Sequence, residues 1–166
     1  MNTKVNSKIE SKIREDLSPT RNLTGLHLKI VAAIAIIWSL FQLWYASPFP
    51  FIFNFGMFKG LPARAIHLGF ALTLAFLIYP FAKGKKISVF DILISFVGAF
   101  SCFYIYFFYD QLVDRGGVLL SISIGNNFNL PIELIIGSLG ILILLEATRR
   151  AIGLPLVIIA ICFLLF

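Results

Sequence analysis

Charged residues are scarce in this chain of 166 residues, since Asp, Glu, Lys and Arg make up only 13% of it. In an ordinary soluble domain roughly 25% of the residues are charged. Here 59% of the residues are hydrophobic. The composition therefore excludes an ordinary soluble domain and predicts a protein embedded in a lipid bilayer. The net charge of +6 does not indicate nucleic-acid binding, because the basic residues lie at the edges of apolar runs and form no patch with interleaved aromatics. We therefore expect no nucleic-acid partner.

Cysteine and histidine are also rare, with two of each. Cys102 and Cys162 lie inside apolar runs, where a free thiol behaves as a small hydrophobic group, and their spacing indicates neither a disulfide framework nor a metal site. His27 opens the first apolar run and His67 lies near the start of the second, at the opposite face. Because a hydrocarbon core is about 30 Å thick, the two cannot ligate one haem within this chain. We predict no metal and no cofactor.

Catalytic motifs are missing as well. The chain contains no Gly-rich phosphate loop, no HExxH and no paired carboxylates, so nothing indicates ATP hydrolysis or metal chemistry. Ser138, in the stretch IIGSLGI, has glycines at the wrong spacing for an intramembrane serine protease, and no His is expected near its depth. Gly137 and Gly140 instead favour close helix packing. We predict no catalytic residue and no enzyme.

Five apolar runs follow a polar N-terminal segment. Residues 1–22 contain no apolar stretch and no cleavage site, which predicts a cytoplasmic tail and not a signal peptide. Since a spanning helix needs about 20 residues, we predict an all-α membrane protein with four transmembrane helices over residues 23–150. A fifth, truncated linking helix is expected over residues 151–166, because CFLLF ends the chain without a polar flank. The runs are Leu26–Ala46, Ala63–Phe81, Val89–Tyr109, Pro131–Ala147 and Ala151–Phe166.

The positions of Lys and Arg predict the orientation of these helices. The side with more of them is cytoplasmic, and it holds the N-terminus, the link between the second and third runs, and the end of the fourth run. We therefore predict a multi-pass protein of the bacterial inner membrane with its N-terminus in the cytoplasm. The inner side carries Lys4, Lys8, Lys12, Arg14, Arg21, Lys29, Lys83, Lys85, Lys86, Arg149 and Arg150, and the outer side carries Lys59, Arg64 and Arg115.

The outer loop Ser47–Pro62 is aromatic but interrupted by proline and glycine, so it cannot span the membrane. We expect it to lie along the outer interface or to dip against neighbouring helices, because backbone at that depth must be shielded by protein or be helical. Trp44 and Tyr45, which end the first run, favour the headgroup level. It either rests on lipid headgroups or forms a docking surface for an outer partner. In the second outer loop, Pro131 is predicted in the first turn of the fourth helix and Glu133 close behind it, where negative charge is favoured.

A group of charges separates the last two apolar runs, in the stretch LLEATRRAIGLP. On a helix Glu146 can reach both Arg149 and Arg150, and the arginine heads are expected to extend into the headgroup layer. Gly153 and Pro155 then predict a bend at the cytoplasmic surface. The cluster Glu146, Arg149, Arg150, Gly153 and Pro155 is either a stop signal with an anchor, or a hinge clamped against a second membrane subunit.

One carboxylate opens the third run, at Asp91. A carboxylate in the first turn of a helix is favoured by the helix dipole, which predicts a cap with Lys85 or Lys86 nearby. The alternative is a proton relay at the inner membrane face.

Three stretches resemble a known family. RAIHLGFALTLAFLIYP (Arg64–Pro80), SLFQLWYA (Ser39–Ala46) and LEATRRAIGLPLVIIAICFLL (Leu145–Leu165) are similar to the N-terminal membrane region of fused permeases of tripartite ATP-independent periplasmic (TRAP) transporters. The similarity runs from about Leu23 to the end and favours the branch served by TAXI-type solute-binding proteins. The LEATRR block is its most specific part.

The resemblance implies a sodium-driven secondary transporter, a symporter to which a periplasmic solute-binding protein delivers an organic solute, often a carboxylate. A small membrane domain such as this one scaffolds a large permease domain that carries the transport and sodium sites, and a linking helix joins the two. Because the family continues into that large domain, we expect a fragment, a truncated reading frame or a separate small subunit. The composition also fits two other functions. One is a structural or assembly subunit of another membrane complex, and the other is a membrane oxidoreductase.

Overall fold

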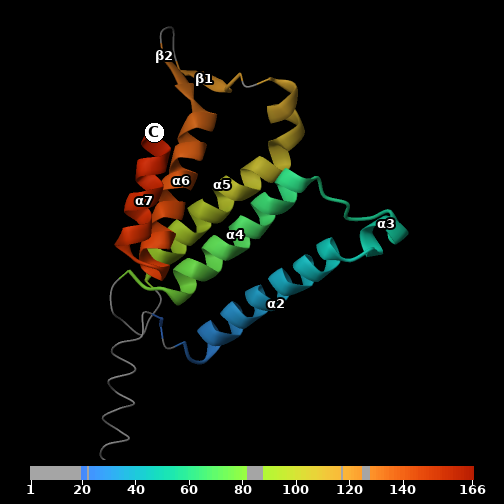
Figure 1. Ribbon diagram of the computed structural model, residues 1–166, viewed down its shortest axis with the longest axis vertical. Coiled ribbons are helices and arrows are strands. Elements are labelled where there is room, and N and C mark those ends of the chain that lie inside the picture. The colour runs from blue at the N-terminus through green and yellow to red at the C-terminus, as the bar shows by residue number, and fades with distance from the viewer. Residues whose placement is uncertain (1–19, 22, 82–87, 117, 125–127) are drawn as a thin grey trace, which may run out of the picture.

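The structure, a computed structural model, describes residues 20–21, 23–81, 88–116, 118–124 and 128–166 and is mostly helical (Figure 1). Most of the predicted tail, and Lys83, Lys85 and Lys86, therefore lie outside the described residues. The elements in chain order are α2 (Leu26–Ala46), α3 (Phe49–Phe53), α4 (Gly60–Ile78), α5 (Val89–Asp114), β1 (Ser121–Ile124), β2 (Phe128–Pro131), α6 (Ile132–Ala151) and α7 (Leu154–Leu165).

Three of the helices, α2, α4 and α5, are long and apolar enough to cross a membrane. They contain 21, 19 and 26 residues, against the roughly 20 that a hydrocarbon core requires. Helix α6 has 20 residues, about 30 Å at 1.5 Å per residue, but it carries charges near both ends. The 12 residues of α7 extend about 18 Å, which is shorter than one crossing.

The core lies where α4, α5 and α6 meet. Its buried residues are Leu72, Phe76, Cys102, Ile143 and Ala147. Small residues bring these helices close together: a Cβ atom on Gly98 would lie 2.9 Å from Cγ2 of Ile143, and one on Gly140 would lie 3.4 Å from Cβ of Ser101. Without a hydrophobic driving force inside lipid, such close backbone approach is what holds membrane helices together.

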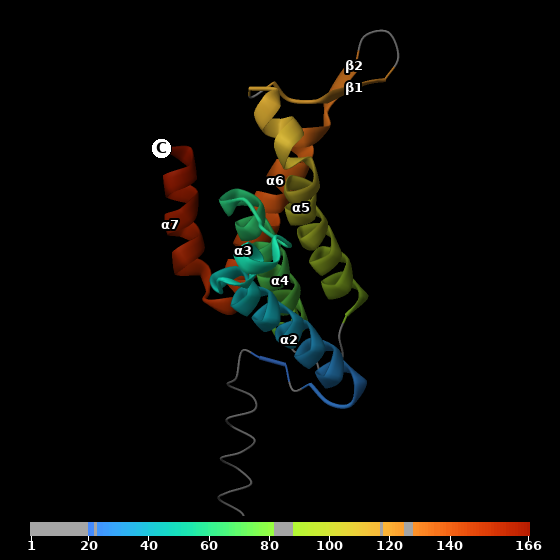
Figure 2. The same ribbon diagram turned by 90° about the vertical axis from the view of Figure 1, so that its right-hand side faces the viewer.

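Helices α2 and α7 lie at the two sides of this core. Helix α2 packs mainly on α4, where Val31 contacts Leu74 and Leu77, and α7 packs on α6. Both views show α7 turning back beside α6, so that its free end points toward the hairpin end of the bundle (Figures 1 and 2). Most of the large apolar side chains of α2 and α7 are exposed, as expected of helices that face lipid or another membrane-embedded chain.

The loops contain structure that the sequence did not predict. In the loop after α2, Phe49–Phe53 form the short helix α3, which lies beyond the end of α2 and away from α5 to α7 (Figure 1). Between α5 and α6, β1 and β2 pair as an antiparallel hairpin, with Ser121 opposite Pro131 and Ile124 opposite Phe128. The hairpin leads directly into α6, so Pro131 is the residue before the helix and not part of its first turn.

Candidate functional site

The group of charges at the end of α6 folds as an ion-pair cluster. Arg149 donates two hydrogen bonds to Glu146, from Nε to Oε2 and from Nη2 to Oε1, each 2.7 Å long. Arg150 donates from Nε to the same Oε1, also at 2.7 Å. The spacing of three and four residues on one helix face explains both contacts, and Glu146 holds the two arginines as expected.

Asp91 joins this cluster from α5, which the sequence did not predict. Its side chain is only 1% exposed, and it accepts a 2.7 Å hydrogen bond from Nη1 of Arg150 on one oxygen and a 2.7 Å bond from Nη2 of Arg21 on the other. A buried carboxylate needs such paired donors, because leaving it unpaired in a low dielectric is costly. Its described partners are therefore two arginines, while the lysines expected beside it lie outside the described residues.

The two buried arginines also contact the end of α4. Arg21 donates from Nη1 to the Leu77 carbonyl oxygen at 3.3 Å, and its backbone N–H donates to the Ile78 carbonyl oxygen at 2.8 Å. The guanidinium of Arg150 lies over the ring of Phe76, 4.9 Å from the centroid. The two hydrogen bonds from Arg21 satisfy carbonyl groups that a helix end leaves without partners. The Asp91 cluster, defined as Arg21, Asp91, Glu146, Arg149 and Arg150, thus joins α4, α5, α6 and the segment before α2.

The predicted extension of both arginine heads into the headgroup layer is wrong for Arg150. Its side chain is 3% exposed and points into the protein, whereas that of Arg149 is 39% exposed. The difference follows from the partners, because Arg150 donates to the buried Asp91 and lies over the ring of Phe76, whereas the carboxylate that binds Arg149 is Glu146 on its own helix. Two buried nitrogens, Nε of Arg21 and Nη2 of Arg150, have no hydrogen-bond partner among the described residues.

The helix break expected after the cluster lies at Gly153. Helix α6 ends at Ala151, Gly153 has a φ of +115° that side chains rarely adopt, and Pro155 is in the first turn of α7. Gly153 allows the reversal, and Pro155 fits a helix start because it lacks the N–H that would have no partner there. The bend therefore comes directly after the Asp91 cluster.

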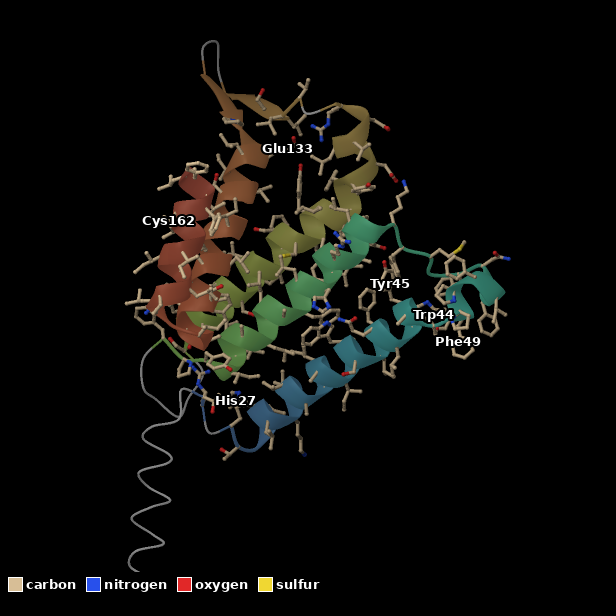
Figure 3. All side chains as sticks on the ribbon, in the orientation of Figure 1. His27, Trp44, Tyr45, Phe49, Glu133 and Cys162 are labelled. Carbon is tan, nitrogen blue, oxygen red and sulfur yellow. The ribbon has the colours of Figure 1, made fainter. Side chains whose placement is uncertain are left out.

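A second ion-pair cluster lies at the other end of the bundle, around Glu133 (Figure 3). This buried carboxylate accepts hydrogen bonds from Nη2 of Arg115 at 2.5 Å, from the Tyr104 hydroxyl at 3.2 Å and from the Leu120 backbone N–H at 2.8 Å. The Glu133 cluster, defined by these four residues, ties the end of α5 and the chain leading to β1 onto the first turn of α6. Along α6, Glu133 and Glu146 are separated by about 20 Å.

The single reactive residues noted in the sequence are not brought together. His27 is at the exposed start of α2, far from Glu133 (Figure 3). His67 on α4 accepts on Nδ1 from Nε1 of Trp38 at 3.3 Å and contacts Nε2 of Gln42 on α2, so it links two helices. Ser138 is exposed. Among the described residues, no group of His, Cys, Asp and Glu could hold a metal ion.

The aromatic loop has its own internal packing. The rings of Phe49, Phe53 and Phe55 lie around Trp44, at centroid distances of 6.3, 6.3 and 6.4 Å, and Figure 3 shows Trp44 and Phe49 beside each other at the end of α2. The loop ends at Lys59, which donates to Asp110 on α5. This hydrogen bond raises the pKa of Lys59, but both side chains are largely exposed, so the pair adds little stability.

Comparisons of the chain with protein-family models, with curated proteins and with solved structures found no match. The role of the two clusters is therefore argued from their geometry. Asp91 and Glu133 are buried, each cluster connects several elements, and the carboxylates in each have their oxygens occupied by donors. This is the arrangement of groups that hold helices in place.

Proposed function

We propose that this chain is the small scaffolding membrane domain of a TRAP-type, sodium-coupled secondary transporter. The observation that supports this most directly is the fold of the LEATRR block, whose Glu146 and Arg150 join α6 to Asp91 on α5 and to the end of α4. The block that carries the family resemblance is thus used to hold helices together. A scaffold needs a fixed bundle of this kind with apolar faces left for a partner.

The proposed arrangement has four spanning helices, α2, α4, α5 and α6, with α7 as the start of a linking helix. Helix α6 qualifies by its 20 residues and by ion pairs near both its ends, which neutralise the charges that would otherwise oppose its insertion. The Asp91 end faces the cytoplasm in this proposal, since Arg21, Arg149 and Arg150 gather there. The Glu133 end and the aromatic loop then face the periplasm of a bacterial inner membrane.

The proposed partners are the large permease domain or subunit, which would carry the solute and sodium sites, and a periplasmic solute-binding protein that delivers an organic solute of the carboxylate class. The exposed apolar side chains of α2 and α7 offer the large domain a surface at membrane depth. The bend at Gly153 directs α7 back along α6 and sets where a linking helix would leave this domain.

The test is co-purification with a large permease domain encoded downstream of, or next to, this reading frame. The wild-type chain is expected to retain that domain in mild detergent, and sodium-dependent uptake in vesicles is expected only when both are present. A matched pair of variants sharpens the test: replacing the exposed Phe163 on α7 by Ala should weaken retention, whereas replacing the exposed Val118 before β1 by Ala should not. Uptake by this chain alone would overturn the scaffold proposal.

A structural or assembly subunit of another membrane complex is the second candidate, and the same clusters support it equally. The two proposals differ in the partner. Cross-linking in native membranes followed by mass spectrometry distinguishes them, since recovery of a multi-span permease supports the first and recovery of an unrelated complex supports the second.

A further inference from the structure

The ring of His67 on α4 has a donor that nothing in the described part of the chain accepts. Its Nδ1 accepts a 3.3 Å hydrogen bond from Nε1 of Trp38 on α2. An indole N–H can only donate, so Nδ1 carries no proton and the ring is neutral, with its one proton on Nε2. The contact with Gln42 is on Nδ1 as well. Among the described residues, the Nε2–H of His67 therefore has no acceptor.

This donor lies at the depth of the hydrocarbon core. Helix α4 contains 19 residues and is about 28 Å long at 1.5 Å per residue, close to the roughly 30 Å of the core. His67 is about 10 Å from the start of that helix, and its side chain is exposed. Acyl chains carry no acceptor, and the polar groups of lipids lie outside the core. An Nε2–H that faced lipid would thus stay unpaired, at a cost in free energy.

Arg64 is a second group without a partner on α4. Residues three apart on a helix are neighbours, so Arg64 lies one turn from His67, toward the start of α4. Its side chain is exposed, and no described residue forms an ion pair or hydrogen bond with it. Helices α2 and α4 contain no Asp or Glu. The α2/α4 seam, defined by Trp38, Gln42, Arg64 and His67, therefore presents a cation and an N–H donor but no carboxylate.

We propose that the α2/α4 seam binds a membrane-spanning helix of the large permease domain through an Asp or Glu on that helix. The carboxylate accepts a hydrogen bond from Nε2 of His67 and pairs with Arg64, so one side chain satisfies both groups. Lipid would leave His67 unpaired. A second copy of this chain in the seam would add another Arg64, and its α2 and α4 would bring no carboxylate. This inference rests on the proposed scaffolding role, because it names where on this chain the partner's helix binds.

The first experiment tests for the carboxylate by cross-linking. The change Arg64→Lys keeps the cation and introduces a primary amine, which a membrane-permeable carbodiimide joins to a nearby carboxylate as an amide, with loss of water. The full chain with this change is co-expressed with the large permease domain, treated in native membranes and analysed by mass spectrometry. We expect a link from position 64 to an Asp or Glu in a spanning helix of the large domain. The wild-type chain is the control, because a guanidinium does not form this amide.

The second experiment measures the Kd of the complex with the purified large domain in detergent. His67→Leu removes the donor and Arg64→Gln removes the cation, and each should raise the Kd about three- to tenfold, the range expected for one hydrogen bond between membrane helices. Thr73→Val is the matched control on α4 and should leave the Kd unchanged, because the Thr73 hydroxyl already donates to the Gly69 carbonyl oxygen at 2.8 Å.

The two variants differ in their risk to the fold. His67 also holds α2 through Trp38, so His67→Leu could loosen the bundle. Arg64 is exposed and has no partner among the described residues, so Arg64→Gln stays informative if His67→Leu fails to fold. Circular dichroism checks the helix content of each variant.

Some outcomes would overturn this inference and leave the scaffolding role intact. They are retention of the large domain with no link from position 64, a link from position 64 only to a carboxylate of this chain, or a Kd for Arg64→Gln equal to that of the wild-type chain. Failure of the wild-type chain to retain the large domain would refute the scaffolding role itself, and this inference with it.

Discussion

Replacing Arg150 should destabilise the bundle far more than replacing its neighbour Arg149. The two arginines share Glu146 as a partner, but only Arg150 is buried and only Arg150 bonds to Asp91. The change Arg150→Met keeps a long apolar side chain and removes the charge and the donors. Arg149→Met is the matched control on the same helix turn.

The magnitude follows from what each change leaves behind. Breaking a buried ion pair by removing one partner costs about 3–5 kcal/mol. Because Asp91 keeps Arg21 at 2.7 Å, we expect Arg150→Met to lower the free energy of unfolding by about 3 kcal/mol, near the lower limit of that range. For Arg149, whose side chain is 39% exposed, the loss should be about 0–1 kcal/mol.

The assay is reversible unfolding in mixed micelles, with helix content followed by circular dichroism. A double-mutant cycle with Asp91→Asn measures the coupling between Asp91 and Arg150, expected at about 0.5–3 kcal/mol for groups in one network. Equal losses for Arg149→Met and Arg150→Met, or a coupling indistinguishable from zero, would refute the reasoning that Asp91 depends on Arg150.

Three further predictions test other parts of the chain. Single cysteines at Lys59 and Lys85, after replacement of the native cysteines, should label with impermeant reagents from outside and inside respectively, and the reverse pattern would contradict the proposed orientation. Gly98→Val should cost about 1–3 kcal/mol through overpacking against α6, measured in the same micelle assay; an unchanged stability would mean that α5 and α6 are not in close contact there. Glu133→Leu should speed hydrogen exchange at the backbone amides of the hairpin. Tyr104→Phe, which removes only one of the donors to Glu133, should change the exchange much less. Equal effects of the two variants would contradict the role of the Glu133 carboxylate in holding the hairpin in place.

The long helices were predictable from the sequence because their signal is local, whereas the short helix α3 was not predicted. Long apolar runs with a single charge each gave α2, α4 and α5 to within a few residues at most of their ends. The spacing from Glu146 to Arg149 and Arg150 predicted both arginine contacts of that carboxylate. The bend also had a local cause in Gly153 and Pro155. These features depend on residues within one or two helix turns of each other, so no knowledge of the packing was needed.

The partners of Asp91 could not be predicted in the same way. Arg21 and Arg150 are 70 and 59 residues away along the chain, and only the packing of α4, α5 and α6 brings them to one place. The signal that could have found them is electrostatic, because a carboxylate at the end of a membrane helix needs cations at the same depth. The hairpin was missed for a related reason, since its four-residue strands are too short for an alternating pattern to stand out.

The order of the ion pairs along the chain has a consequence for biosynthesis. A ribosome releases Arg21 first and Asp91 second, so this pair can form while α6 is still unmade. Arg150 arrives 59 residues after Asp91, when α4 and α5 are already available to receive it. The final guanidinium therefore enters a site built by earlier helices, and the second oxygen of Asp91 gains its donor only once α6 is in place.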